Sequence, residues 1–145
     1  MTGAPTRALL LVEDNPGDVT LVQEAIGDDA TIEITVAGNG KTAMAMLRQN
    51  GEYAKMSHPD LILLDLKLPN KSGLELLAEL KGDAKLRRIP VIVFTSSELD
   101  RDISQAYDLH ANCYVTKPPD LDGFMAAICS IRDFWLGTAT LPQFD

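Results

Sequence analysis

The amino-acid sequence predicts an α/β domain in which a parallel β-sheet is covered by helices on both faces. Five short, strand-like segments alternate with five longer amphipathic ones along the 145 residues, an order typical of strand–helix repeats. Strands that are buried on both faces occur in a sequence as solid apolar runs rather than as alternating ones. Three of the short segments have this character, and they lie within 7–12, 60–65 and 89–95.

The first two strands and helices are expected before residue 50. The run 7–12 stops at an acidic pair, and Pro16 then suits the first turn of a helix. Residues 31–36 are rich in β-branched side chains and predict the second strand. The segment 38–40 breaks the chain before the second helix. We expect the inner faces of these two helices to carry Val19, Val22, Ala25, Ile26, Ala43, Met44 and Leu47.

The next elements repeat this order. Residues 60–65 predict the third strand, and the third helix is expected to begin at Ser72 or a neighbouring residue. Residues 89–95 predict the fourth strand, and 112–116 predict a short fifth strand that ends at Lys117. We expect the inner faces of the third and fourth helices to carry Leu74, Leu77, Leu80, Leu99, Ile103, Ala106 and Leu109.

A long amphipathic helix is predicted near the C-terminus, because apolar residues recur there at steps of 3, 4, 3 and 4. These residues are Leu121, Phe124, Ile128, Ile131 and Trp135. We therefore expect a single domain over 1–145, with its core at about 7–135 and a short tail at 136–145.

The chain is acidic, with 13 basic and 21 acidic residues and a net charge of −8. Nucleic-acid binding depends on clustered Lys and Arg, and the densest group is Lys85, Arg87 and Arg88, so no nucleic-acid partner is expected. No apolar stretch approaches the ~18 residues of a membrane span and no signal peptide is recognisable, so we expect a cytoplasmic protein without a membrane partner. Cys113 and Cys129 are interpreted as small buried residues rather than as a disulfide.

Polar residues gather where the predicted strands end. Ligands of open α/β sheets bind beyond the carboxyl ends of the strands, so the topology would bring these residues to one edge. Each of them alone is more typical of a helix cap or a loop, but their coincidence on one edge indicates a chemical site. They are Glu13, Asp14, Asn15, Asp65, Thr95, Ser96 and Lys117.

The three carboxylates at this edge suggest the chemistry of the site. Packed together, they would repel one another and resist simultaneous ionisation. Mg²⁺ would relieve that repulsion, because it takes oxygen ligands and needs only one or two carboxylates from a protein. The cation would draw a phosphoryl group toward a carboxylate nucleophile, and Lys117 and the Thr95 hydroxyl would bind the other phosphoryl oxygens. This constellation suits phosphorylation of an aspartate.

A family resemblance rests on the same residues. They are Glu13-Asp14, Asp65 with Leu68-Pro69 and Gly73, Thr95-Ser96, and Lys117-Pro118. Over about 7–135 the chain resembles the response-regulator receiver domains of two-component signalling, which implies a flavodoxin-like fold with strand order 2-1-3-4-5. The intervals of 30 residues from Asp65 to Thr95 and 22 from Thr95 to Lys117 are similar to the family's. The first acidic pair is further from Asp65 than in compact members, and we place the extra residues at 51–59.

The resemblance implies roles in phosphorylation and switching. Asp65 would be the phosphoacceptor, Lys117 would pair with the phosphoryl group, and Thr95 would close over it as the switch hydroxyl. Tyr114 would be the switch aromatic that moves inward with Thr95, although it also suits an ordinary strand-edge tyrosine. The Lys117–Pro118 peptide would be cis and would aim the lysine.

The resemblance also implies the ligands of Mg²⁺. Asp14, Asp65 and the backbone carbonyl of Lys67 would bind the cation, and Glu13 would bind it directly or through water. Glu13 departs from the family pattern, which often has Asp at that position. Lys67 lies at a variable position, where a cation could alter the dephosphorylation rate or could simply face solvent.

Segments 12–18 and 65–69 are similar to one subgroup, the single-domain regulators that partner bacterial phytochromes. This resemblance implies a histidine kinase, such as a bacterial phytochrome, as the phosphoryl donor, and it also implies a homodimer. Phe134 and Trp135 could form the dimer contact, or they could fold onto their own core. With no output domain in 145 residues, the signal would leave by protein contact or onward phosphotransfer.

Three alternatives remain from the residues alone. An aspartate-nucleophile phosphatase of the haloacid dehalogenase type would need a second Asp where Lys67 stands. A flavodoxin-like FMN carrier would need a phosphate loop where Glu13 and Asp14 would repel a phosphate. A scaffold that no longer accepts phosphate is the third alternative, although Asp65, Thr95 and Lys117 are all retained.

Overall fold

The computed structural model describes residues 6–27 and 29–144, so the ends of the expected domain, 1–5 and 145, and residue 28 lie outside it. The strands are β1 (Arg7–Val12), β2 (Ile32–Ala37), β3 (Leu61–Leu64), β4 (Val91–Thr95) and β5 (Cys113–Thr116). The helices are α1 (Pro16–Ile26), α2 (Gly40–Leu47), α3 (Gly73–Gly82), α4 (Asp100–Asp108) and α5 (Leu121–Asp133). Short turns of helix also occur: η1 (Gly51–Tyr53), η2 (Leu86–Arg88) and the π-helical η3 (Phe134–Thr138).

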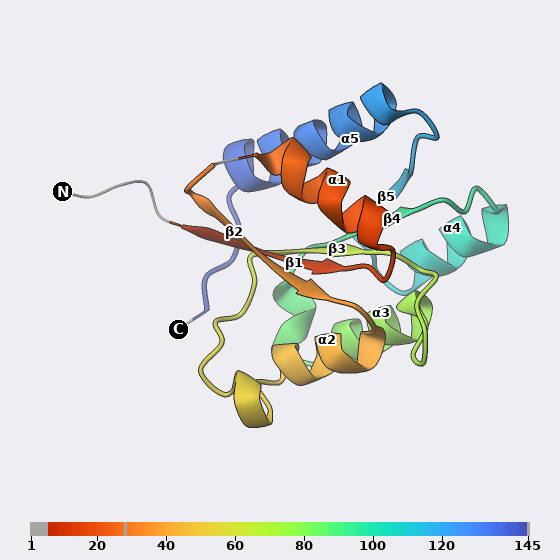
Figure 1. Cartoon of the computed structure of the whole chain (residues 1–145). Coiled ribbons are helices and arrows are strands. Elements are labelled where there is room, and N and C mark those ends of the chain that lie inside the picture. Colours follow the sequence, from red (N-terminus) through yellow and green to blue (C-terminus); the bar gives the residue numbers. More distant parts are fainter. Residues whose placement is uncertain (1–5, 28, 145) are drawn as a thin grey trace.

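The five strands form one parallel sheet in the order β2-β1-β3-β4-β5, which confirms the predicted fold class and strand order. α1 and α5 cover one face of this sheet, and α2, α3 and α4 cover the other (Figure 1). Each strand–helix–strand connection places the next strand parallel to the last, so every strand ends at the same edge. That edge carries the polar residues singled out from the sequence.

The core is divided in two by the sheet, and this division explains the apolar runs. Along β1, Leu9 and Leu11 point into the cluster under α1 and α5, whereas Leu10 and Val12 point into the cluster under α2 and α3. Because both faces are buried from Leu9 to Val12, a polar residue at any of these positions would lose burial energy. β3 follows the same rule, and all four of its residues are buried.

Helix starts are fixed by side-chain caps at the positions that the sequence suggested. Asn15 accepts a hydrogen bond from the Asp18 N–H at 3.1 Å, and Ser72 accepts one from the Glu75 N–H at 3.2 Å. Such caps satisfy backbone donors that the first turn of a helix leaves unpaired. They also fix where the strand-end loops stop, and therefore where the site residues lie.

Some expectations about individual side chains were wrong. Leu99 and Leu121, expected on inner faces, are 51% and 58% exposed, because they precede or begin their helices rather than lie within the packed stretch. Leu76, not singled out in the sequence, is fully buried on α3. Cys113 and Cys129 are unpaired as expected but only half-buried.

The C-terminal region departs from a single long helix. α5 ends at Asp133, and η3 continues the chain with a hydrogen bond from the Ala139 N–H to the Phe134 carbonyl at 2.7 Å. The following tail folds back on the domain: Leu141 is buried, and the Phe144 ring stacks on His58 at 4.6 Å. His58 lies in the segment before β3, where the extra residues 51–59 were placed and where η1 is found.

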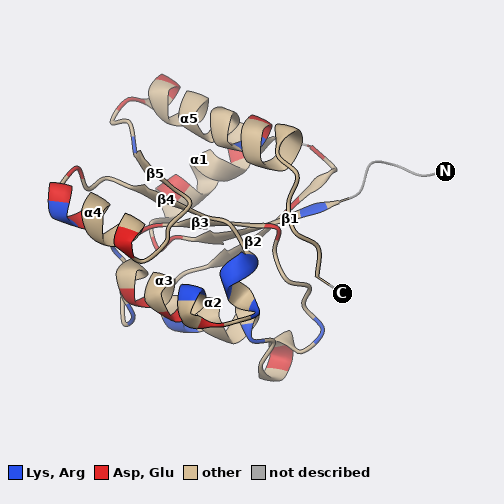
Figure 2. Cartoon of the chain, turned by 180° about the vertical axis from the view of Figure 1, so that it is seen from behind, with Lys and Arg blue, Asp and Glu red and all other residues tan. Residues whose placement is uncertain are grey.

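The surface charges and helix lengths bear on possible partners. Figure 2 shows that α3 and α4 carry both acidic and basic residues, so neither helix bears a single sign of charge. Among the described residues, no helix has the length and apolar character needed to cross a membrane.

Candidate functional site

The candidate site lies at the carboxyl edge of the sheet, where three strands deliver one charged residue each. Glu13 directly follows β1, and its N–H bonds the Ala37 carbonyl at 3.0 Å. Asp65 directly follows β3, and its N–H bonds the Val12 carbonyl at 3.0 Å. Lys117 directly follows β5, with its N–H on the Thr95 carbonyl at 2.7 Å. The backbones of all three are therefore held by the sheet.

Glu13, Asp14 and Asp65 form a compact group of carboxylates. Each offers an oxygen atom within 4.8 Å of the other two. Glu13 and Asp65 are only 3% and 7% exposed, whereas Asp14 faces solvent. Three hard oxygen ligands that are open to solvent on one side form a site for a divalent cation.

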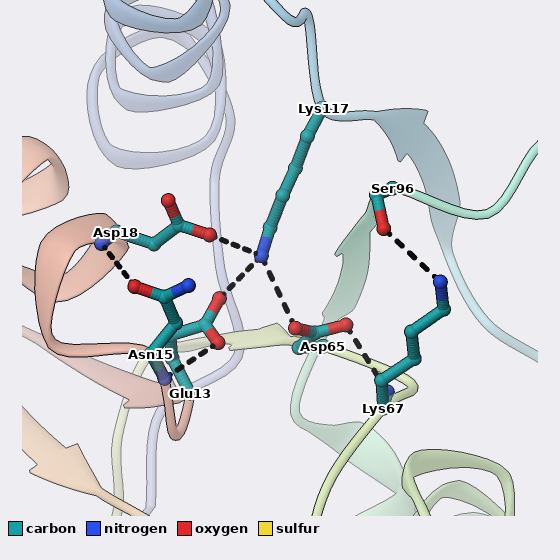
Figure 3. Close-up of polar contacts among 7 residues, drawn as sticks. All are labelled: Glu13, Asn15, Asp18, Asp65, Lys67, Ser96 and Lys117. Carbon is teal, nitrogen blue, oxygen red and sulfur yellow. Dashed lines mark hydrogen bonds and ion pairs between the residues drawn. The ribbon is translucent and has the colours of Figure 1, made fainter.

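Lys117 lies opposite these acids and forms three ion pairs (Figure 3). Its Nζ is 2.6 Å from Glu13 Oε1, 2.7 Å from Asp18 Oδ2 and 3.1 Å from Asp65 Oδ2. The ammonium has three N–H donors, so each of the three carboxylates can take one. The lysine side chain is itself only 11% exposed, which places these ion pairs in a largely desolvated environment.

Burial and pairing displace the pKa values of this cluster. Burial, together with the charge of Asp65, raises the pKa of Glu13 from 4.5 to about 7, against the opposing effect of Lys117. Burial also favours a higher pKa for Asp65, but the Lys67 N–H and the Lys117 charge outweigh it, and the pKa of Asp65 lies below its ordinary value. Burial would lower the pKa of Lys117, but hydrogen bonds to Asp18 and Glu13 outweigh it and raise that pKa. Asp65 is therefore ionised at neutral pH and Lys117 is charged.

The loop after β3 fixes the Asp65 side chain. Asp65 Oδ1 accepts the Lys67 N–H at 3.1 Å, so both carboxylate oxygens have partners, one on the loop and one on Lys117. Gly73 lies against the back of this loop, where a Cβ atom would come within 2.4 Å of the Asp65 carbonyl oxygen. The Lys67 side chain reaches across to Ser96, with its Nζ 3.3 Å from Oγ, and both residues are exposed to solvent.

Thr95 and Tyr114 lie on the side of the site nearest α4. Thr95 is fully buried, and its hydroxyl has no hydrogen-bond partner among the described residues. Tyr114 is half-buried, and its hydroxyl donates to the Ser97 carbonyl at 2.9 Å, two residues after Thr95. The hydroxyl of Tyr107 on α4 accepts a hydrogen bond from the Tyr114 backbone N–H at 3.1 Å. A hydrogen-bonded path therefore joins the loop after β4 to β5 and α4.

The prediction of a cis Lys117–Pro118 peptide was wrong, because the described part of the chain contains no cis peptide bond. The trans form is the favoured one for X–Pro bonds, by about 0.5–1 kcal/mol. Lys117 is aimed at the site without the bend, because the sheet holds its backbone and three carboxylates hold its side chain.

Asp18 was not predicted as part of the site. It lies in the first turn of α1, where an acidic residue is usually explained by the cap and the helix dipole. Its partner, Lys117, is 99 residues away in the chain, so no local pattern connects them. The available signal was topological, since both the start of α1 and the end of β5 lie at the same edge of the sheet.

Phe134 and Trp135 differ in their surroundings. Phe134 is 52% exposed, whereas Trp135 packs partly against the cluster under α1 and α5. Their rings meet edge to face, with centroids 5.4 Å apart. One aromatic therefore folds onto the chain's own core, and the other is presented to solvent.

A hollow of about 460 Å³ opens beside Lys117. It lies between the start of α1 and the loop before α5, with Asp18, Ser96 and Lys117 among its lining residues and Pro118 and Phe124 on the apolar side. The lysine and Asp18 are thus reachable from solvent through this opening.

The fold and this site define a receiver domain. The chain belongs to the response regulators of two-component signalling, since the family model "Response regulator receiver domain" matches residues 9–129. It is therefore a phosphoacceptor signalling protein of that family rather than an enzyme in the ordinary sense. The family model covers β1 through most of α5, and so includes every residue of the acidic cluster.

Particular relatives are more specific than the family. The chain is 46% identical over 140 residues to the response regulator Rcp1 of Synechocystis sp., with 95% of each protein covered. The phosphorylated structure of the cyanobacterial phytochrome response regulator RcpA matches it with a TM-score of 0.93 at 50% identity, covering 95% of this chain and 99% of that one. The Mn²⁺-bound form of Rcp1 matches with a TM-score of 0.91 at 45% identity, covering 94% and 99%.

The bacteriophytochrome response regulator AtBRR is also similar, with a TM-score of 0.74 at 36% identity, and 98% and 100% of the two chains covered. The predicted similarity to phytochrome-associated regulators is thus confirmed.

Proposed function

We propose that the chain accepts a phosphoryl group on Asp65 from a histidine kinase, with Mg²⁺ at the neighbouring acidic cluster. The observation that supports this most directly is the Asp65 carboxylate itself. It is buried and ionised, with a lysine 3.1 Å from one oxygen and a cation site on its open side. A carboxylate in this position can act as a nucleophile, because the cationic groups beside it would stabilise the negative charge of the phosphorylated product.

Phosphoryl transfer would use the chain's own groups as follows. An Asp65 oxygen attacks the phosphorus of the donor phosphohistidine, the P–N bond breaks, and the imidazole leaves with the electron pair of that bond. The product is an acyl phosphate on Asp65. The Lys117 ammonium, now 3.1 Å from Oδ2, would bind a phosphoryl oxygen and offset its negative charge. The Lys67 N–H keeps the other carboxylate oxygen oriented.

Mg²⁺ is the cation that fits this chemistry, because it combines carboxylate ligands with phosphoryl oxygens and retained waters. Glu13, Asp14 and Asp65 would supply carboxylate oxygens, and the backbone carbonyl of Lys67 is the proposed fourth protein ligand. The cation would neutralise charge that develops on the transferred phosphoryl group.

The switch would begin at Thr95, whose buried hydroxyl lacks a partner among the described residues. A phosphoryl oxygen on Asp65 would supply one, and movement of Thr95 would shift Ser97 just beyond it. Tyr114 is bonded to the Ser97 carbonyl, so its ring and the α4–β5 surface would move with that loop. A local change of charge would thereby alter a surface that other proteins can contact.

The proposed partners are a histidine kinase of the phytochrome class and a second copy of this chain. The similarity to RcpA and AtBRR supports the first. The half-exposed Phe134 supports the second, since large aromatic residues are enriched in interfaces. The phosphatase alternative is disfavoured, because that reaction needs an aspartic acid as the general acid at position 67. This chain has Lys67 there, and its side chain bonds to Ser96.

The test is the intact mass of the protein after incubation with acetyl phosphate and Mg²⁺. We expect a gain of one phosphoryl group, about 80 Da, that is lost in Asp65→Asn and in the absence of metal. An absent gain in the wild type would favour the scaffold alternative, once beryllium fluoride, which mimics the acyl phosphate without being hydrolysed, has also failed to bind.

A further inference from the structure

We propose that Asp18 is a positioning residue that holds Lys117 when a cation occupies the acidic cluster. The inference rests on the proposed function, because it concerns how the lysine is kept in place during phosphorylation. The three ion pairs of Lys117 are not equivalent.

Two of the three partners of Lys117 are also members of the acidic cluster. Glu13 and Asp65 both belong to the group of carboxylates within 4.8 Å of one another, whereas Asp18 does not. A cation bound by that group would compete with the lysine for Glu13 and Asp65. It would not compete for Asp18, whose Oδ2 lies 2.7 Å from Nζ.

Asp18 is held more rigidly than a loop residue would be. It lies in the first turn of α1, and its N–H donates to Asn15 Oδ1 at 3.1 Å. The Asn15 N–H in turn donates to Glu13 Oε2 at 3.2 Å, so Glu13, Asn15 and Asp18 form one hydrogen-bonded turn (Figure 3). The helix therefore presents Asp18 to the lysine from a fixed point on the wall of the hollow.

The consequence follows from the three donors of an ammonium group. When the cation takes Glu13 and Asp65, Lys117 loses up to two of its acceptors, and Asp18 keeps one N–H in place. The remaining donors can then face a phosphoryl group on Asp65. Without Asp18, the flexible four-carbon side chain of the lysine would have no fixed acceptor in the metal-loaded site. It would also return to Glu13 and Asp65 and so compete with the cation.

The direct test observes the Lys117 ammonium by ¹⁵N NMR, with the signal assigned by its loss in Lys117→Arg. In the wild type we expect the slowly exchanging ammonium signal both without metal and in saturating Mg²⁺. In Asp18→Asn we expect it without metal, because Glu13 and Asp65 remain as partners, but not in saturating Mg²⁺. This readout does not depend on phosphorylation.

Two further measurements follow the same variant. Titration calorimetry should show Mg²⁺ affinity about 10-fold weaker in Asp18→Asn, the low end of the effect of losing an outer-shell partner. The maximal rate of phosphorylation by acetyl phosphate should also fall about 10-fold, with little change in the half-saturating concentration, because the lost contact matters in the transition state. Asp18→Glu retains a carboxylate and should recover most of both losses.

Glu24→Gln is the matched control, since Glu24 lies on α1, is exposed and carries the same charge. The inference is overturned if Asp18→Asn equals Glu24→Gln in the NMR and Mg²⁺ measurements, or if it is phosphorylated faster than the wild type. If the wild type and all variants fail to gain mass, the proposed function fails, and the NMR and Mg²⁺ titrations still decide the role of Asp18.

Discussion

Gly73 offers the sharpest test of how the chain backs its phosphoacceptor loop. In Gly73→Ala, the new Cβ would lie 2.4 Å from the Asp65 carbonyl oxygen and 2.5 Å from Leu66 Cα. Ordinary van der Waals contacts begin about 1 Å further out, and both atoms belong to the backbone, so no rotamer change can relieve the overlap. The loop must move, and Asp65 must move with it.

The expected cost follows from these distances. Overpacking of a rigid site typically costs 1–3 kcal/mol, and replacing Gly by Ala returns about 0.4–1 kcal/mol through the unfolded state. We therefore expect Gly73→Ala to lower the free energy of unfolding by about 1–2 kcal/mol. Phosphorylation of Asp65 should slow as well, because its carboxylate would no longer meet Lys117 at the same distance.

Gly82→Ala is the matched control at the other end of α3, where a Cβ would meet nothing within 4 Å. It should raise the free energy of unfolding by about 0.5–1 kcal/mol, the usual gain for Ala in a helix. Urea unfolding followed by circular dichroism measures both variants. If Gly73→Ala lies within 0.5 kcal/mol of the wild type, the close backing of the loop by α3 does not hold it in place.

Three further predictions concern the charged site and the exposed aromatic. The pKa of Glu13 is raised from 4.5 to about 7 in the folded chain, so between these two pH values the folded state binds more protons than the unfolded state. The free energy of unfolding therefore falls as the pH rises from 4.5 to about 7. Glu13→Gln has no carboxyl group to titrate at this position and should not show this loss of stability. Without metal, the melting temperature of the variant minus that of the wild type should therefore increase from pH 4.5 to pH 8. A difference that stays constant over this range would contradict the raised pKa. Lys117→Ala leaves Glu13 and Asp65 buried without their cationic partner, so in metal-free buffer at pH 8 it should lower the free energy of unfolding by about 3–5 kcal/mol. Mg²⁺ should restore much of this loss. Equal losses with and without Mg²⁺ would contradict a site in which the lysine and the metal ion bind the same carboxylates. Phe134→Ala should change the free energy of unfolding by less than about 1 kcal/mol, because the ring is half-exposed. We expect light scattering to show a dimer of the phosphorylated wild type but not of Phe134→Ala, and a dimer of equal strength in the variant would exclude Phe134 as its contact.

The features predicted best from the sequence are the strands of the sheet, because burial on both faces requires them to be apolar. The apolar runs that became β1, β3 and β4 leave little alternative to a parallel sheet, and the parallel sheet then brings Glu13, Asp65 and Lys117 to one edge. Topology alone therefore assembled most of the site. The starts of α1 and α3 were predictable for a local reason, since Asn15 and Ser72 each satisfy a backbone donor of the helix that follows.

The features that were missed depend on contacts between distant segments. Asp18 has an adequate local explanation at a helix start, and its pairing with Lys117 exists only once α1 and β5 are placed together. Periodicity likewise could not show that Leu99 and Leu121 lie just outside the packed stretches of their helices. The trans peptide at Pro118 was missed because family resemblance, rather than any local force, had suggested a cis bond.

The hydroxyl of Tyr107 limits how another protein can bind to the edge of the sheet at β5. β5 is an outer strand, and an outer strand normally exposes backbone donors to which a foreign strand can add. Tyr107 occupies one such donor, the Tyr114 N–H, from the neighbouring helix. While α4 stays in place, this border of the sheet is thereby closed at Tyr114 to β-augmentation. A protein that binds at this edge must therefore recognise side chains rather than backbone groups. Its affinity would then depend on small displacements of α4.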